Sequence, residues 1–195
     1  MRYMHKGMQR QDEGRKAKLI FGLIGASFSY FEDAKAVLSG HFGAIDFESG
    51  YIDFDFTRYY EKELGRGLKR KFISFLDDIE IEKMPDIKKV SSAIELRLGR
   101  DEMVSGGISR NINIDPGYLN CGKLVLLSRK DNFHRIRIAD GVYAEITLRF
   151  KDGSFVPMET TYPDYRSSEY IEIFNKIRHL YTESGRLECR STAER

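Results

Sequence analysis

The sequence predicts a single α+β domain in which helices pack on a mixed or antiparallel sheet. A strand-helix-strand unit comes first, helices follow it, and the chain from about residue 108 to residue 158 alternates like a series of strands. Strands and helices that occur in separate runs are typical of an α+β fold. A ferredoxin-like core is one form of this fold that fits the predicted order.

The composition bounds the class of protein. With 195 residues and 41% hydrophobic content, the chain can bury one core. Its 32% charged residues nearly cancel to a net charge of +2, so no whole-protein field attracts nucleic acid or anionic membrane. No apolar run approaches the roughly 20 residues that span a bilayer. Cys121 and Cys189 form no CxxC pair and indicate neither a disulfide framework nor a zinc site. We expect a cytoplasmic protein without a membrane partner.

Polarity also predicts the domain boundaries. Residues 1–16 are too poor in apolar side chains to bury anything and lack the apolar centre of a secretory signal, so we expect a flexible arm. Residues 184–195 read in the same way as a flexible tail. Residues 17–183 contain no repeat or linker and are expected to form one globular domain.

The first half of this domain is predicted as strand, helix, strand and two helices. The run over residues 18–26 is short, apolar and contains glycines, which favours a central strand buried on both faces. Ser29 is the expected N-cap of the next helix, and Gly43 its end. Residues 45–59 alternate as in a strand with one buried face. Residues 64–79 have helical spacing, and Pro85 opens another helix.

The second half is predicted as strands that end in a helix from about Ser167 to Thr182. One hairpin has a register that can be argued. A two-residue Asp140-Gly141 turn would mix polar and apolar side chains on both faces, whereas a three-residue loop with left-handed Gly141 separates them. The predicted pairs are Arg137 with Tyr143, Arg135 with Glu145, and Ile136 with Ala144. The apolar face is then Ile136, Ile138, Val142, Ala144, Ile146 and Leu148.

Three polar segments, residues 111–118, 130–135 and 160–165, form the candidate ligand site. They carry more ionisable, amide and aromatic side chains than strand ends require. The candidate ligand-binding residues are Arg110, Asn111, Asn113, Asp115, Lys130, Asp131, Arg135, Tyr143, Tyr162 and Asp164. Cationic donors among them suit an anion, and the amides suit orienting hydrogen bonds. The hypothesis requires that the three segments converge. Asp115-Pro116-Gly117-Tyr118 also fits a type II turn, which needs no ligand.

His134 and Glu145 are the candidate general acid or base. The predicted register places His134 on the apolar face, which is also typical of a boundary histidine with one hydrogen bond. Arg135 and Glu145 form a cross-strand ion pair, which would contribute roughly 0.2–1 kcal/mol without any ligand. A structural interpretation of this pair and an anion-binding one both stay open.

A second constellation precedes the segment 64–79. Asp53 and Asp55 point the same way on a predicted strand and could hold Mg²⁺ with waters and a phosphate, although a solvated edge strand looks alike. The adjacent Tyr59 and Tyr60 cannot both face the core of a strand, so they join the candidate ligand-binding residues. Glu61 joins them too, although a helix N-terminus also favours its charge.

Several reaction motifs are missing from the sequence. It contains no GxxxxGK[ST], GxGxxG, HExxH or GxSxG pattern. Lys130-Asp131 is similar to part of the base-reading NKxD motif of GTPases. Without a phosphate loop, GTP binding is only a minor alternative.

Motifs in a fixed order carry a family resemblance. They are Thr57-x-Tyr59-Tyr60-Glu61-x-Glu63-x-Gly65, Asn113-x-Asp115-Pro116-Gly117-Tyr118, Lys130-Asp131, His134-Arg135, Gly141-x-Tyr143-x-Glu145-x-Thr147-Leu148 and Thr161-Tyr162-Pro163-Asp164-Tyr165. Together they resemble the bacterial family called "domain of unknown function 4416" from about Lys18 to Glu183. Leu64 departs from the expected methionine. The resemblance implies a compact cytoplasmic bacterial protein with no established activity. Some relatives carry the label "GTP-binding protein".

The leading hypothesis is a domain that binds, or also acts on, a phosphorylated or otherwise anionic small molecule or nucleotide. One alternative is a metal-dependent phosphoryl or nucleotidyl transferase that uses Asp53 and Asp55 beside Asp115. Another is a non-catalytic module for RNA or protein, for which Tyr143 between Arg135 and Arg137 is a partial match. The sequence decides neither the presence of a reaction nor the oligomeric state.

Overall fold

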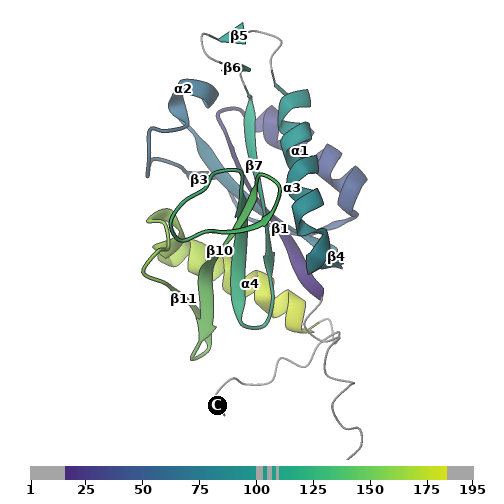
Figure 1. Cartoon of the computed structure of the whole chain (residues 1–195), viewed down its shortest axis with the longest axis vertical. Coiled ribbons are helices and arrows are strands. Elements are labelled where there is room, and N and C mark those ends of the chain that lie inside the picture. Colours follow the sequence, from purple (N-terminus) through teal and green to yellow (C-terminus); the bar gives the residue numbers. More distant parts are fainter. Residues whose placement is uncertain (1–15, 100–102, 105–106, 109, 184–195) are drawn as a thin grey trace, which may run out of the picture.

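The computed structural model describes residues 16–99, 103–104, 107–108 and 110–183. The predicted tail 184–195 and all but the last residue of the predicted arm 1–16 lie outside this part. In the described part, a nine-stranded antiparallel sheet carries helices on both faces, so the α+β prediction is confirmed (Figure 1). None of the helices in these ranges is long and apolar enough to cross a membrane.

The elements follow one another in this order. They are β1 (Lys16–Gly25), α1 (Phe28–Phe42), β2 (Ile45–Glu48), β3 (Ile52–Asp53), α2 (Glu61–Leu64), β4 (Lys69–Glu80), α3 (Met84–Arg97), β5 (Met103–Val104), β6 (Gly107–Ile108), β7 (Ile112–Leu119), β8 (Lys123–Ser128), β9 (Ile136–Ala139), β10 (Val142–Lys151), β11 (Ser154–Pro157) and α4 (Ser168–Glu183). Short 3₁₀ turns precede α3 and α4.

The first half of the chain forms a ferredoxin-like core, as predicted. The segments β1–α1–β2–β4–α3–β7 follow the βαββαβ order, and the strands lie in the sheet order β7-β1-β4-β2 with antiparallel neighbours. Each helix therefore connects two strands that a third strand separates. Both helices pack on one face of the sheet. Beyond β7 the sheet continues through β8, β10 and β11, and α4 covers the opposite face.

The strand β1 is the central strand that the apolar run predicts. Leu19, Phe21 and Leu23 pack against α1 and α3, whereas Ile20 packs towards α4. Burial on both faces explains why this segment lacks polar alternation.

Several predicted elements need correction. Residues 64–79 are mostly β4 and not a helix, because this strand lies beside β1 and has both faces buried around Phe72 and Ile73. Residues 45–59 form the two short strands β2 and β3 and not one strand. The N-cap of α1 is Ser27 and not Ser29, whereas Gly43 does end this helix with a φ of 92°. The helix opened by Pro85 and the last helix are confirmed as α3 and α4.

The hairpin β9–β10 keeps two of the predicted pairs but not the predicted three-residue loop. Val142 pairs with Ala139 across the two-residue Asp140-Gly141 turn, and a register shift between Val142 and Tyr143 follows. Arg137 pairs with Tyr143 and Ile136 with Ala144, and Gly141 has a φ of 60°. Between Ile146 and Leu148 the pairing with β8 shifts by one residue. The bulge turns Leu148 to the α4 side, whereas Val142 faces α1 and α3, so the single apolar face predicted for both is wrong.

The cysteine expectation also needs a correction. Cys121, in the turn between β7 and β8, is disulfide-bonded, which the cysteine spacing did not indicate. Cys189 lies outside the described residues.

Candidate functional site

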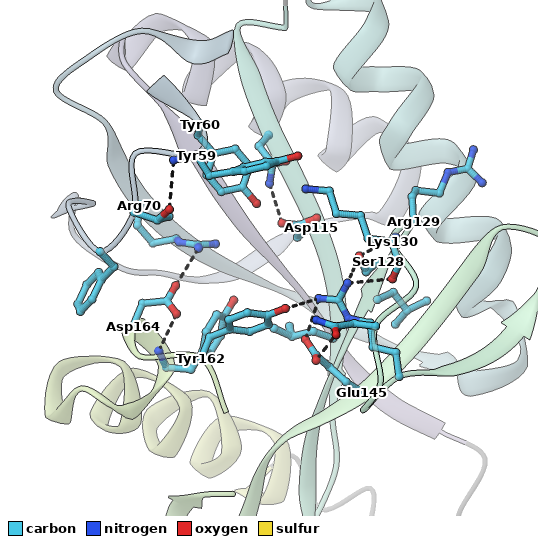
Figure 2. A pocket seen from close by; sticks show the side chains of 18 of the residues that line it. Tyr59, Tyr60, Arg70, Asp115, Ser128, Arg129, Lys130, Glu145, Tyr162 and Asp164 are labelled. Carbon is cyan, nitrogen blue, oxygen red and sulfur yellow. Dashed lines mark hydrogen bonds and ion pairs between the residues drawn. The ribbon is translucent and has the colours of Figure 1, made fainter. Parts of the chain in front are cut away.

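A cavity of about 490 Å³ opens where three loops meet above the sheet (Figure 2). The loops are those after β3, between β8 and β9, and before α4, and the cavity floor comes from β4, β7, β8 and β10. The helix α3 contributes Lys88, Ser92 and Glu95 to the wall. This volume is within the range of roughly 300–1,000 Å³ that small-molecule sites occupy.

The cavity exists because β7 and β8 separate. They pair only from Gly117 to Leu119, so among the described strands only β1 pairs with the first half of β7. A Cβ on Gly117 would lie 2.6 Å from the Val125 carbonyl oxygen, so only glycine allows the strands to cross this closely. Pro116 precedes it and has no N–H for a ladder bond. Residues 115–118 therefore belong to β7, and the type II turn predicted for them is wrong.

Side chains of α3 take the place of the missing strand. The Ile114 N–H donates to Glu95 Oε1 at 2.5 Å, where a strand carbonyl would otherwise accept it. Lys88 Nζ donates to Asp115 Oδ1 at 3.0 Å. Lys88 and Glu95 are 3% and 5% exposed, so α3 carries two buried charges to the gap. Their helical spacing was visible in the sequence, but charged residues on a helix normally face solvent.

Arg110 is the centre of an ion-pair network at one end of the cavity. Its Nε and Nη2 donate to the two Glu63 oxygens at 2.5 and 2.7 Å, and its Nη1 donates to Glu95 at 2.8 Å and to Asn113 at 3.2 Å. Asn113 Nδ2 then donates to Asp115 Oδ2 at 2.6 Å. The hydrogen bonds from Arg110 lower the pKa of Glu63, whereas burial raises the pKa of Glu95. Four of the five guanidinium donors are thus engaged within the protein.

Arg135 connects the loop after β8 with the wall of the cavity. It donates to Ser128 Oγ at 2.8 Å, to the Lys130 carbonyl at 2.9 Å and to the Tyr162 hydroxyl at 3.0 Å. Two longer contacts at 3.4 and 3.5 Å reach Glu145, and His134 Nε2 also lies against this carboxylate. All five donors of Arg135 point at protein acceptors, so its direct hydrogen-bonding capacity is used.

Arg70, in contrast to Arg135, has few of its N–H donors bound to protein acceptors. Its guanidinium is buried among the rings of Phe54, Phe72 and Tyr165, with its central carbon 4.9–5.7 Å from their centroids. Its Nη2 donates to Asp164 Oδ2 at 3.2 Å and the guanidinium also acts on the Tyr170 hydroxyl, while its Nε is buried without a partner in the described part of the chain. A buried guanidinium normally has most donors paired. Burial raises the pKa of Asp164 despite this contact.

Exposed aromatic and cationic side chains surround the opening. Lys130 Nζ lies 3.7 Å from the centroid of the Tyr59 ring, and within the described ranges no carboxylate lies within ion-pair distance of it. In the described part of the chain, the one hydrogen bond that the Arg129 side chain donates is to the Gly141 carbonyl oxygen at 3.4 Å. Phe56, Tyr59 and Tyr162 line the cavity and are 45%, 60% and 38% exposed.

The structure brings together most of the candidate residues. Those that line the cavity are Tyr59, Tyr60, Arg110, Asn113, Asp115, Lys130, Asp131, Arg135, Glu145, Tyr162 and Asp164. His134 contacts the Glu145 carboxylate and does not line the cavity. Asn111, Tyr143 and Glu61 are also outside its lining, and Asn111 donates to the Leu98 carbonyl at 2.8 Å. Arg70, Lys88 and Glu95 line the cavity, although the sequence did not single them out.

The two aspartates considered for Mg²⁺ lie elsewhere. Asp53 pairs with Lys69 at 2.5 Å beside the edge of the sheet, Asp55 is exposed, and neither lines the cavity. The Asp53–Asp55–Asp115 grouping that a metal-dependent transferase needs is therefore not formed. Among the described residues no three histidine, cysteine, aspartate or glutamate side chains are placed to hold a metal ion.

The family model described as "Domain of unknown function (DUF4416)" matches residues 15–181, which include every cavity residue. The chain belongs to this family. No curated protein and no solved structure matches it. The resemblance carried by the ordered motifs is thus confirmed, and a functional conclusion has to come from the geometry of the cavity.

Proposed function

We propose that the cavity binds a small phosphorylated or otherwise anionic molecule, nucleotides included, in the cytoplasm. The observation that carries this proposal is Arg70, a buried guanidinium on the cavity wall whose Nε has no partner among the described residues. A phosphate or carboxylate oxygen is the natural acceptor for its unpaired donors, and such charge-assisted bonds in a low-dielectric site are about twice as strong as neutral ones.

Lys88 is the second donor that we assign to the anion. Its ammonium has three N–H donors, and Asp115 takes one of them within the described chain. Arg70 and Lys88 both act on the Asp115 carboxylate, which holds its pKa below the usual value against the effect of burial. Both cations line the cavity, and an anionic group bound beside Asp115 would bridge them.

Arg110 and Arg135 have a positioning role in this proposal. Their donors hold Glu63, Glu95, Ser128 and Tyr162 in place, and they add positive charge while nearly all of their N–H groups are engaged by protein. Both oxygens of Glu145 are likewise engaged by Arg135, with His134 against one of them. We assign Glu145 to positioning of the β8–β9 loop rather than to proton transfer.

The experiment that tests the proposal is calorimetric titration with inorganic phosphate, ribose 5-phosphate, citrate and ribonucleoside 5′-monophosphates, preceded by a thermal-shift screen. A ligand at 100 times its dissociation constant stabilises the fold by roughly 2.7 kcal/mol. We expect saturable binding of at least one anion, with a loss of at least tenfold in Arg70→Lys, which keeps the charge but loses the fork.

The matched control is Arg137→Lys, since Arg137 is 61% exposed, pairs with Asp140 and lies outside the cavity. Lys88→Met is a second cavity variant, in case Arg70→Lys alters the fold. Absence of saturable binding by every probe, or equal affinity in both cavity variants and the control, would refute the proposal. Attention would then move to an RNA or protein partner.

A further inference from the structure

The opening of the cavity differs chemically from its base. Phe56, Tyr59 and Tyr162 expose between 38% and 60% of their area while they line the cavity, and they come from two loops far apart in sequence. Rings that only stabilise the fold are covered by protein, as Phe72 and Tyr170 are. Exposed rings at a cavity mouth offer faces that a planar ligand group can cover.

The Tyr59 ring is held in place by two neighbouring side chains. One side of its ring packs edge-on with Tyr60 at a centroid distance of 5.1 Å, and the Lys130 ammonium lies over the ring at 3.7 Å. Figure 2 shows Tyr59 and Tyr60 on the far side of the cavity from Tyr162 and Glu145. An exposed cation–π contact is weaker than the stacking of a nucleobase on an aromatic ring. A base can therefore displace the ammonium from Tyr59 and leave Lys130 available for a phosphate.

Polar groups for a base edge are also present at the mouth. Asp131 and Asn132 line it and are exposed. Within the described chain the Asp131 carboxylate has no cation in ion-pair distance, and Asn132 uses its oxygen to accept the Phe133 N–H, which leaves its amide donor. Nucleobase edges present donors and acceptors side by side, which these two residues complement.

We infer that the ligand is a nucleoside phosphate, with its phosphate at Arg70 and Lys88 and its base against Tyr59 and Tyr162. The inference rests on the proposed function, which concerns the anion alone. Sugar phosphates and inorganic anions would satisfy the cations and leave the rings at the mouth uncovered. A nucleotide covers both ends of the cavity.

The test is a comparison of affinities for ribose 5-phosphate and the four ribonucleoside 5′-monophosphates. We expect at least one nucleotide to bind tenfold or more tightly than ribose 5-phosphate, in the range that one stacked base supplies. Tyr59→Leu should remove this advantage, whereas Tyr59→Phe, which keeps the ring, should retain it. Phe133→Leu is the matched control, because Phe133 is 89% exposed on the same loop as Lys130 but outside the cavity.

The outcomes separate the inference from the function beneath it. Equal affinity for ribose 5-phosphate and every nucleotide overturns the inference and leaves anion binding intact. The inference fails in the same way if Tyr59→Leu and Tyr162→Leu both keep the nucleotide advantage. If neither ribose 5-phosphate nor any nucleotide binds, the base cannot be the recognised group and the inference also fails, while phosphate and citrate decide the fate of the proposed function.

Discussion

At the scale of single residues, N–H donors without a protein partner indicate the binding site better than the types of residue in the sequence do. Arg110 and Arg135 stand in polar motifs and attract notice in the sequence, yet nearly all their donors bond to protein. Arg70 and Lys88 stand in segments that read as structural, yet they carry the free donors at the cavity wall. The difference depends on tertiary partners, which residue spacing does not reveal.

Asp164 gives a prediction about pH at this scale. Burial raises the pKa of Asp164, and its carboxylate accepts a hydrogen bond from Arg70 Nη2. Protonation of Asp164 removes a negative charge beside the anion and frees Arg70. Anion affinity should therefore rise as the pH falls from neutral towards the pKa of Asp164, since the bound anion favours the protonated carboxyl.

The measurement is titration with ribose 5-phosphate at several pH values for wild type and Asp164→Asn. The phosphate titrates identically in both experiments, so the ratio of the two affinities isolates the protein. We expect Asp164→Asn to bind more tightly at pH 7 and the two proteins to converge as the pH falls. A ratio that does not change with pH would show that Asp164 does not oppose the anion.

At the scale of elements, the crossing of β7 and β8 sets the shape of the cavity, and Gly117 sets the crossing. A Cβ at this position would lie 2.6 Å from a backbone oxygen of Val125 and 2.8 Å from Leu126, which cannot both move away. Gly117→Ala should lower the free energy of unfolding by about 3 kcal/mol, the upper part of the usual overpacking range. Urea denaturation measures this change.

Gly122→Ala is the matched control for that substitution. Gly122 lies in the turn between the same two strands, and a Cβ added there would have no atom within 4 Å. Its effect should stay within about 0.5 kcal/mol, as for most surface changes. If Gly117→Ala is equally mild, the strands can separate further and the close crossing does not define the cavity.

Elements also show where sequence patterns suffice and where they fail. In the hairpin β9–β10 the pairs Arg137–Tyr143 and Ile136–Ala144 could be predicted, because a slip would mix the polar and apolar faces, but the register shift between Val142 and Tyr143 could not. The strand β4 was mistaken for a helix, because Leu68, Phe72 and Phe75 satisfy helical spacing and burial on both faces removes the polar alternation. The residue types in Asp115-Pro116-Gly117 are those of a turn. In the structure they lie within β7, at the point where its pairing with β8 ends. Local patterns cannot distinguish these cases.

The candidate site itself was predictable in part. Eleven of the named residues line one cavity because motifs on separate loops converge at the end of the sheet. The polar side chains that α3 and β4 contribute to the cavity are buried among apolar ones, so the sequence pattern does not indicate a binding role for them. Asp53 and Asp55 are spaced as carboxylates of a metal site could be, but β3 ends at Asp53, and neither aspartate lines the cavity.

At the scale of the whole molecule, the cavity is a consequence of adding strands and α4 to a ferredoxin-like core. The core supplies Arg70 and Lys88, the added strand β10 supplies Glu145, and the loop before α4 supplies Asp164. The Tyr165 ring stacks on Phe174 of α4 with an interplanar angle of 11° and also flanks Arg70. The position of α4 is thereby linked to the position of the guanidinium.

The centre of this arrangement is Gly22 on β1, which pairs with Phe72 on one side and Asp115 on the other. A Cβ there would lie 2.9 Å from Arg70 Nη1 and 3.4 Å from the Tyr165 hydroxyl. The flexible end of Arg70 can yield, so the strand should tolerate Gly22→Ala with a loss of about 1 kcal/mol. The displaced guanidinium should nevertheless weaken anion binding about tenfold, as measured by calorimetric titration.

Gly25→Ala is the comparison on the same strand, since a Cβ at Gly25 would lie no closer than 3.4 Å to any atom and Gly25 does not line the cavity. It should bind the anion like wild type. If Gly22→Ala also retains full affinity, Arg70 either binds no anion or adapts freely, and the argument from its unpaired donors fails. If only Gly22→Ala loses affinity, the absence of a side chain at Gly22 is what allows the Arg70 guanidinium to take its anion-binding position.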